Sequence, residues 1–292
     1  MRIVVPAIFL SIILILLSRR LQASLREKLN VRPALVFIAP TVLSFFFGAI
    51  AASLDAFSVP LAALIVIYTL VPSFYAYSVR HMPAPWWPDF LLILWLWLPL
   101  EFAAGAQWVP KPAQGLLHMA AYGVSITLGL ILLLLTRRLE GTKYNLPSNW
   151  RDLWNVLLAF VVIAPVLIAL GRAIGFLDPF HIPPNLSVIR IIVQFLVILA
   201  ATALPEEILF RGFIQNFLMQ KLGANVRTLV LAGLIFGCAH LNNGPQALPN
   251  WRYTILATLA GITYGKVFQE SSSIFASAGI HALINTIKHI CF

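Results

Sequence analysis

Two adjacent glutamates, Glu206 and Glu207, interrupt a stretch of the chain that is otherwise almost entirely apolar, and Arg211 follows shortly after them. Residues four apart on a helix lie on the same face, so we expect Glu207 to pair with Arg211. Glu206 points about 100° away from that pair, because an α-helix has about 3.6 residues per turn. A carboxylate without a local cation can act as a general base. The alternative is an ordinary ion pair at a membrane interface, with Glu206 merely hydrated.

Two histidines and an asparagine lie in other apolar stretches. His240 follows Phe236 by four residues, while His281 and Asn285 are one helical turn apart and therefore share a helix face. Buried polar groups need hydrogen-bond partners, and they find them most easily by converging. We therefore expect one hydrated cavity to be shared by Glu206, His240, His281 and Asn285.

These residue types have the chemistry needed to hydrolyse an amide. A carboxylate can deprotonate water, a histidine can relay the proton, and a histidine together with an asparagine can donate hydrogen bonds to an oxyanion. The HExxH signature of zinc proteases and the GxSxG signature of serine hydrolases are both absent.

The same groups offer a second possibility, a divalent metal such as zinc held by His240, His281, Glu206 and Glu207. Asparagine is a poor zinc ligand and adds no negative charge to hold a cation, whereas it is a good donor to an oxyanion. We therefore expect that no cofactor is required, with zinc as the alternative.

The elements that carry these residues are strongly apolar. The 292-residue chain is 60% hydrophobic and 10% charged, with a mean hydropathy of +0.90. An ordinary soluble domain has about 25% charged residues, so this composition excludes a water-soluble globule and a disordered chain. The net charge of +10 does not indicate a nucleic-acid partner. Lys and Arg lie mostly between the apolar runs, as in multi-pass membrane proteins.

The apolar runs predict the fold class. A membrane-spanning helix needs about 20 apolar residues, and the runs predict an all-α, polytopic transmembrane helix bundle with about 8–10 spans. We expect N-terminal transmembrane helices of unknown role in residues 1–150 and a catalytic transmembrane domain in residues 151–292. The runs are Ile3–Leu17, Ala34–Ala52, Val59–Tyr77, Phe90–Ala106, Leu116–Leu135, Trp154–Leu170, Ile191–Phe210, Thr228–His240, Tyr253–Val267 and Ser273–Ile290.

Three motifs in the second half resemble those of the CPBP family, which includes the CAAX proteases and bacteriocin-processing enzymes (also called Abi or type II CAAX prenyl endopeptidases). The family pattern is EExxxR, then FxxxH, then HxxxN or HxxxD. It is matched here by Glu206–Arg211, Phe236–His240 and His281–Asn285. The resemblance covers about Trp154–Ile290.

The resemblance implies an intramembrane endopeptidase of the glutamic type, and some family members are described as metalloproteases. By motif, Glu206 would be the general base and His240 would orient the attacking water. His281 and Asn285 would form the oxyanion hole, supported by Glu207, Arg211 and Phe236.

The substrate implied is a membrane-anchored protein or peptide, either prenylated or otherwise tagged, and the compact connections favour a bacterial inner membrane. The alternative from another class is a noncatalytic membrane protein, a transporter or an immunity or scaffold protein, that retains the polar cluster.

Overall fold

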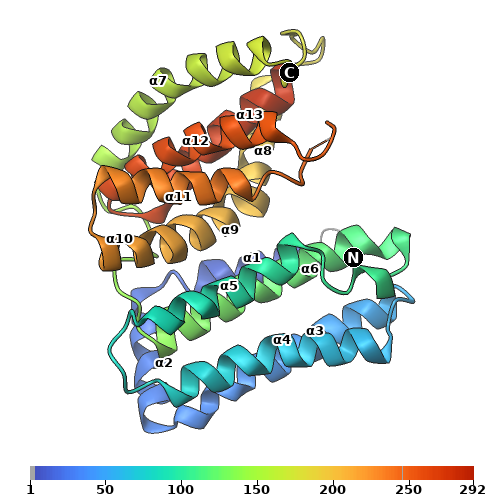
Figure 1. Cartoon of the computed structure of the whole chain (residues 1–292), viewed down its shortest axis with the longest axis vertical. Helices are drawn as coiled ribbons and strands as arrows, with labels where there is room; N and C mark the ends of the chain where they lie inside the picture. Colours follow the sequence, from blue (N-terminus) through green and yellow to red (C-terminus); the bar gives the residue numbers. More distant parts are fainter. Residues whose placement is uncertain (1–3, 245) are drawn as a thin grey trace. The chain divides into compact units, whose positions relative to one another are not determined.

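The computed structural model describes residues 4–244 and 246–292, and within these ranges the regular structure is helical throughout, with no strand (Figure 1). The first predicted apolar run starts at Ile3, which lies outside the described residues, and is seen as a helix from Val4. The all-α class predicted from the sequence is confirmed. The chain forms two compact units, Met1–Gly141 and Thr142–Phe292.

The first unit contains six α-helices and three shorter helical segments among its described residues. They are α1 (Val4–Ile15), α2 (Arg19–Val31), η1 (Pro33–Phe37), α3 (Ile38–Ser53), α4 (Val59–Ser78), α5 (Trp87–Glu101), η2 (Ala106–Trp108), α6 (Lys111–Gly129) and the π-helix η3 (Leu130–Thr136).

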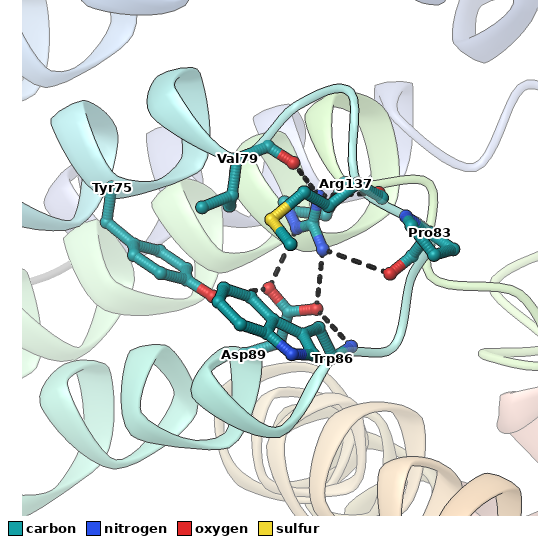
Figure 2. Close-up of polar contacts among 7 residues, drawn as sticks. Tyr75, Val79, Pro83, Trp86, Asp89 and Arg137 are labelled. Carbon is teal, nitrogen blue, oxygen red and sulfur yellow. Dashed lines mark hydrogen bonds and ion pairs between the residues drawn. The ribbon is translucent and has the colours of Figure 1, made fainter.

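A buried ion pair connects helix ends in this unit. The Asp89 carboxylate in the first turn of α5 accepts from Arg137 Nε at 2.8 Å and Nη2 at 2.9 Å, and also from the backbone N–H of Trp86. The Tyr75 hydroxyl donates to the same carboxylate. The remaining donors of Arg137 reach carbonyl oxygens just after α4, among them that of Val79 (Figure 2). Asp89 thus caps the start of α5 while Arg137 caps the end of α4.

The second unit carries the predicted chemistry. Its helices are α7 (Arg151–Ala173), α8 (Val188–Ile198), the π-helix η4 (Leu199–Ala203), α9 (Leu204–Glu207), the π-helix η5 (Ile208–Gln215), α10 (Asn216–Leu222), α11 (Val226–Cys238), α12 (Trp251–Glu270) and α13 (Ile274–Cys291).

Among the described residues, five helical segments are long and apolar enough to cross a membrane, and α1 with α2 would make a sixth despite a bend of 84° between them. This count is lower than the eight to ten spans predicted. The reason is that α5 and α11 are short, at 15 and 13 residues, while α12 and α13 carry more polar residues. The five are Pro33–Ser53, Val59–Ser78, Lys111–Thr136, Arg151–Ala173 and Val188–Leu222. The set is that of a polytopic helix bundle and of an integral membrane protein.

Helices α11 and α12 approach each other closely through glycines spaced four apart, Gly233 and Gly237 on one helix and Gly261 and Gly265 on the other. A Cβ atom at Gly237 would lie only 2.8 Å from the carbonyl oxygen of Thr254. Small residues at this spacing let helix backbones approach in an apolar environment. The close approach brings together the rings of Phe236 and Tyr264, which precede Gly237 and Gly265, with 6.1 Å between their centroids.

The turn between α12 and α13 is bound by the chain that precedes α7 and by the first turn of α7. Lys143 Nζ donates to the carbonyl oxygens of Phe268, Gln269 and Ser271 at 2.6–3.0 Å, at the C-terminal end of α12. Asp152 accepts from the backbone and the hydroxyl of Ser272. These bonds satisfy helix-end groups that would otherwise lack partners, and so fix where α13 begins.

Candidate active site

The two glutamates lie on a helical segment that alternates between α and π conformation. The short α9, which contains both of them, is flanked by the π-helices η4 and η5. Pro205 in α9 has no N–H to donate to the preceding turn, and its ring crowds the carbonyl oxygen four residues earlier, which accounts for the wider turn before it. Widened π turns inside helices are frequent at functional sites.

Glu207 is completely buried and binds two cationic or polar side chains. Its Oε2 atom lies 3.1 Å from Arg211 Nε, so the pairing predicted from the sequence is confirmed. Its Oε1 atom lies 3.0 Å from Nδ1 of His281, which belongs to α13. The second contact joins residues 74 positions apart. Glu207 therefore links the arginine of its own segment to the histidine of the last helix.

Arg211 is enclosed by aromatic rings. Its guanidinium carbon lies 4.4 Å from the ring centroid of Phe236 and 5.6 Å from that of Tyr264, and its Nη2 donates to the Gly261 carbonyl oxygen at 3.2 Å. Only 1% of this side chain is exposed. Cation–π contacts and one carboxylate offset the cost of burying its charge. Arg211 thus connects Glu207 with residues of α11 and α12.

His281 lies between the two carboxylates. Its Nδ1 faces Glu207, its Nε2 is 3.8 Å from Oε2 of Glu206, and its ring stacks on Tyr264 with 4.9 Å between centroids. An ionised carboxylate only accepts hydrogen bonds, so Nδ1 carries a proton toward Glu207. The contact between Nε2 and Glu206 is too long for a hydrogen bond and does not fix the protonation of Nε2.

Both carboxylates keep unused hydrogen-bonding capacity, because Oε2 of each has no hydrogen-bond partner among the described residues, but only Glu206 is partly exposed. Its Oε2 atom is buried and has no hydrogen-bond partner among the described residues, although 22% of the side chain is exposed. An unpaired buried carboxylate oxygen is costly. A hydrogen bond to Glu206 would therefore be favourable.

His240 is held in one tautomer by the end of α11. Its Nδ1 lies 2.8 Å from the carbonyl oxygen of Phe236, and its ring packs against the rings of Phe236 and Tyr253. A carbonyl oxygen can only accept, so Nδ1 carries the proton and Nε2 presents a lone pair. Phe236 thus contributes its backbone to His240 and its ring to Arg211.

A cavity of about 70 Å³ lies beside these side chains. His240, His281 and Asn285 line it together with Tyr253 and Tyr264, and its remaining walls are largely apolar. The volume exceeds the roughly 10–15 Å³ that one water molecule needs. Glu206 differs from the expectation, since it is not one of the lining residues and instead lies next to the cavity through its contact with His281.

Sequence reasoning overlooked three residues of this region: Tyr253 and Tyr264 from α12, and Lys288 from α13, whose Nζ lies 4.5 Å from the Tyr253 ring. One signal was available. Tyr264 immediately precedes Gly265, the second glycine of the pair on α12. Helices pack closely there, so a large side chain next to the glycine must occupy one defined position.

The described residues do not fit the alternative of a metal centre. No group of three or more His, Cys, Asp and Glu side chains among them is arranged to hold a metal ion. Both nitrogens of His281 face carboxylates, and Nδ1 of His240 faces a carbonyl oxygen.

The fold and site together define an integral membrane protein with a cluster of ionisable side chains enclosed by helices. Residues 188–287 match the family described as type II CAAX prenyl endopeptidase Rce1-like. This confirms the resemblance drawn from the three motifs, and every motif residue lies within the matched segment. The segment is thus similar to type II CAAX prenyl endopeptidases, which supports intramembrane endopeptidase activity on a membrane-associated peptide or protein. Comparison with curated proteins and with solved structures gives no match.

Proposed function

We propose that this protein is a glutamic-type intramembrane endopeptidase, in which Glu206 activates water. The observation that supports this most directly is the position of His281 between two carboxylates, of which Glu207 is fully buried against Arg211 and Glu206 is partly exposed and has no cation of its own segment beside it. Paired carboxylates in unlike surroundings divide their roles, and we assign orientation of His281 to the buried Glu207 and the reaction to the partly exposed Glu206.

In the proposed reaction, Glu206 takes a proton from water and the resulting hydroxide attacks the carbonyl carbon of the scissile peptide bond. The lone pair on His240 Nε2 orients the water. The oxyanion that forms accepts hydrogen bonds from Nε2–H of His281 and from the amide of Asn285. The proton held by Glu206 then passes to the leaving nitrogen as the C–N bond breaks.

We further propose that the reaction needs no metal. The absence of a three-ligand arrangement among the described residues supports this, as does the presence of Asn285, which donates hydrogen bonds well but binds zinc poorly. Full loss of activity with a chelator, reversed by stoichiometric zinc, would contradict this part of the proposal.

The substrate we propose is a membrane-anchored protein or peptide, prenylated or otherwise tagged, that is cleaved close to the membrane. The compact connections between helices favour a bacterial inner-membrane protein. A noncatalytic immunity or scaffold protein, or a transporter, is the alternative, and such a protein would keep its function when Glu206 is replaced.

The test compares purified wild type with Glu206→Gln on a library of membrane-anchored peptides. Glu270→Gln is the matched control, because Glu270 is an exposed carboxylate of α12 that pairs with Lys266. We expect Glu206→Gln to lower cleavage by about 10²–10⁴-fold, the usual contribution of a general base, with an unchanged melting temperature. Cleavage retained by Glu206→Gln would remove the proposed role.

A further inference from the structure

A second polar cavity, of about 450 Å³, lies in the first unit. Its walls carry arginines from three separate segments: Arg26 from α2, Arg80 from the chain after α4, and Arg137 and Arg138 from the chain after η3. Glu140 also lines it. We propose that this cavity binds a phosphate group, supplied either by the headgroup of an anionic phospholipid or by a soluble phosphate ester.

Arg137 forms a wall of this cavity and is not available as a ligand. Its charge is balanced by Asp89 through two hydrogen bonds, and its other donors reach backbone carbonyls (Figure 2). Arg26, Arg80 and Arg138 therefore contribute three positive charges to the cavity, and Glu140 contributes one negative charge. Arg26 interacts electrostatically with both Arg138 and Glu140, so like charges are already close together in the empty cavity. An anion would relieve this repulsion.

The three arginines also retain donors for a ligand. Arg80 Nε is buried and has no hydrogen-bond partner among the described residues, while its Nη1 donates to the Tyr77 carbonyl oxygen and its guanidinium lies over the Tyr77 ring. Arg26 directs Nε and Nη2 to one carbonyl oxygen, that of Leu134. A buried N–H without a partner is costly, and charge-assisted bonds to phosphate are the usual solution for arginine.

The backbone at Arg138 is unusual in a way that fits a binding role. Its φ angle is +55°, in the left-handed region that residues with a side chain seldom adopt. This conformation accompanies the placement of the Arg138 guanidinium against Asn30 of α2. Residues held in such conformations cluster at ligand-binding sites.

The surroundings place the cavity at the depth of lipid headgroups. Helix α2 bends 84° from α1, carries a leucine on one face at every fourth position from Leu21 to Leu29, and is otherwise rich in Arg and Lys. A basic amphipathic helix at a sharp angle to an apolar one is typical of the membrane interface. Trp86 and Trp87, exposed at the start of α5, are also typical of that layer. The positive-inside rule places such a basic end on the cytoplasmic face, where anionic lipids attract it.

The test measures binding of phosphatidylglycerol to the purified full-length protein by native mass spectrometry, with phosphatidylcholine as the zwitterionic reference. Arg80→Gln and Arg138→Gln remove cavity cations, whereas Arg20→Gln removes an exposed cation of the same basic segment that does not line the cavity. We expect each cavity variant to weaken phosphatidylglycerol binding by about tenfold, as loss of a charge-assisted hydrogen bond does. Arg20→Gln should change binding by less than about twofold, the scale of an exposed charge.

Competition by glycerol 3-phosphate identifies the source of the phosphate. Displacement of the lipid, with the same dependence on Arg80 and Arg138, would assign the site to a soluble phosphate ester, and failure to displace would assign it to a lipid headgroup. Equal binding in wild type and cavity variants, or an equal loss in Arg20→Gln, would overturn the proposal. If Arg80→Gln unfolds, Arg80→Lys and Arg138→Gln take its place in the test. Arg80→Lys keeps the positive charge, and Arg138→Gln changes an exposed residue, so both proteins are expected to fold.

Discussion

The two units each bury one carboxylate–arginine pair, and the two pairs are used differently. In the first unit, both oxygens of Asp89 and all three guanidinium nitrogens of Arg137 are bonded, mostly to helix-end backbone groups. In the second unit, the Glu207–Arg211 pair extends into His281, and His281 meets a second carboxylate that has an unbonded oxygen. A complete hydrogen-bond inventory marks a structural pair, whereas an incomplete one beside a cavity marks a candidate reaction site.

The most severe test of this comparison is to neutralise each carboxylate in turn, with Asp89→Asn and Glu207→Gln. Each change leaves a buried arginine without its counter-charge, so each is expected to lower stability by about 3–5 kcal/mol, measured by thermal unfolding in detergent. Cleavage per folded molecule should fall only in Glu207→Gln, because only Glu207 contacts His281. Equal losses of cleavage in both variants would mean that the two pairs do not differ in kind.

Asn285→Ala sharpens the comparison in the opposite direction, since it should affect rate and not stability. The Asn285 side chain lines the cavity and makes no hydrogen bond within the described part of the chain. Loss of one oxyanion donor lowers kcat by about 10²–10³-fold, with little change in KM. Asn155→Ala is the control, because Asn155 bonds the end of α12 and should lower only the melting temperature. A melting temperature that falls with Asn285→Ala would place Asn285 among the structural groups.

Helix spacing in the second unit can be tested with Gly237→Ala. The added Cβ would meet the Thr254 backbone at 2.8 Å, so α11 and α12 must separate. We expect a loss of about 1–3 kcal/mol, the usual cost of overpacking, and a lower cleavage rate because Phe236 moves with α11. Gly279→Ala in α13, where the nearest atom would be 3.9 Å away, should be neutral or slightly stabilising. Similar results for both variants would show that close helix approach does not position the cluster.

The smallest effect is expected for Lys143→Met. Lys143 serves the end of α12 much as Arg137 serves the end of α4, by donating to backbone carbonyls. Its removal should cost about 1–2 kcal/mol, in the range for hydrogen bonds from a charged group, as measured by chemical denaturation. Cleavage by the folded protein should not change, and a selective loss of activity would connect the α12–α13 turn to the reaction.

Local spacing was sufficient to predict part of this site from the sequence. The Glu207–Arg211 pair follows from their separation along one helical segment, and it is present. Apolar runs predicted the all-α class for the same reason, since a run of sufficient length reports on a helix without knowledge of its neighbours. Fewer helices meet a length and hydropathy criterion than the spans predicted, because α11 is short and α12 carries more polar residues.

Contacts between distant segments could not be obtained this way. Nothing in the spacing places His281 against both glutamates, because that geometry depends on how α13 packs beside α9. The π conformation of η5 could not be predicted either, because the sequence was interpreted with the periodicity of an α-helix. The catalytic roles of Glu206, His240, His281 and Asn285 stay predictions, for which the variants above provide the tests.

The π-helix η5 makes the number of residues after Glu207 as important as their identity. A π turn accommodates more residues per turn than an α turn, so Ile208–Gln215 holds more chain than an α-helix of the same length along its axis. Deleting a single residue there would let the segment relax into a regular α-helix while both ends stay attached. The side chains after the segment would then keep their places, whereas those inside it, including Arg211, would change direction by up to about 100° relative to Glu207. The site should therefore tolerate many substitutions in this segment better than any change of its length, a difference that a deletion series assayed for cleavage would reveal.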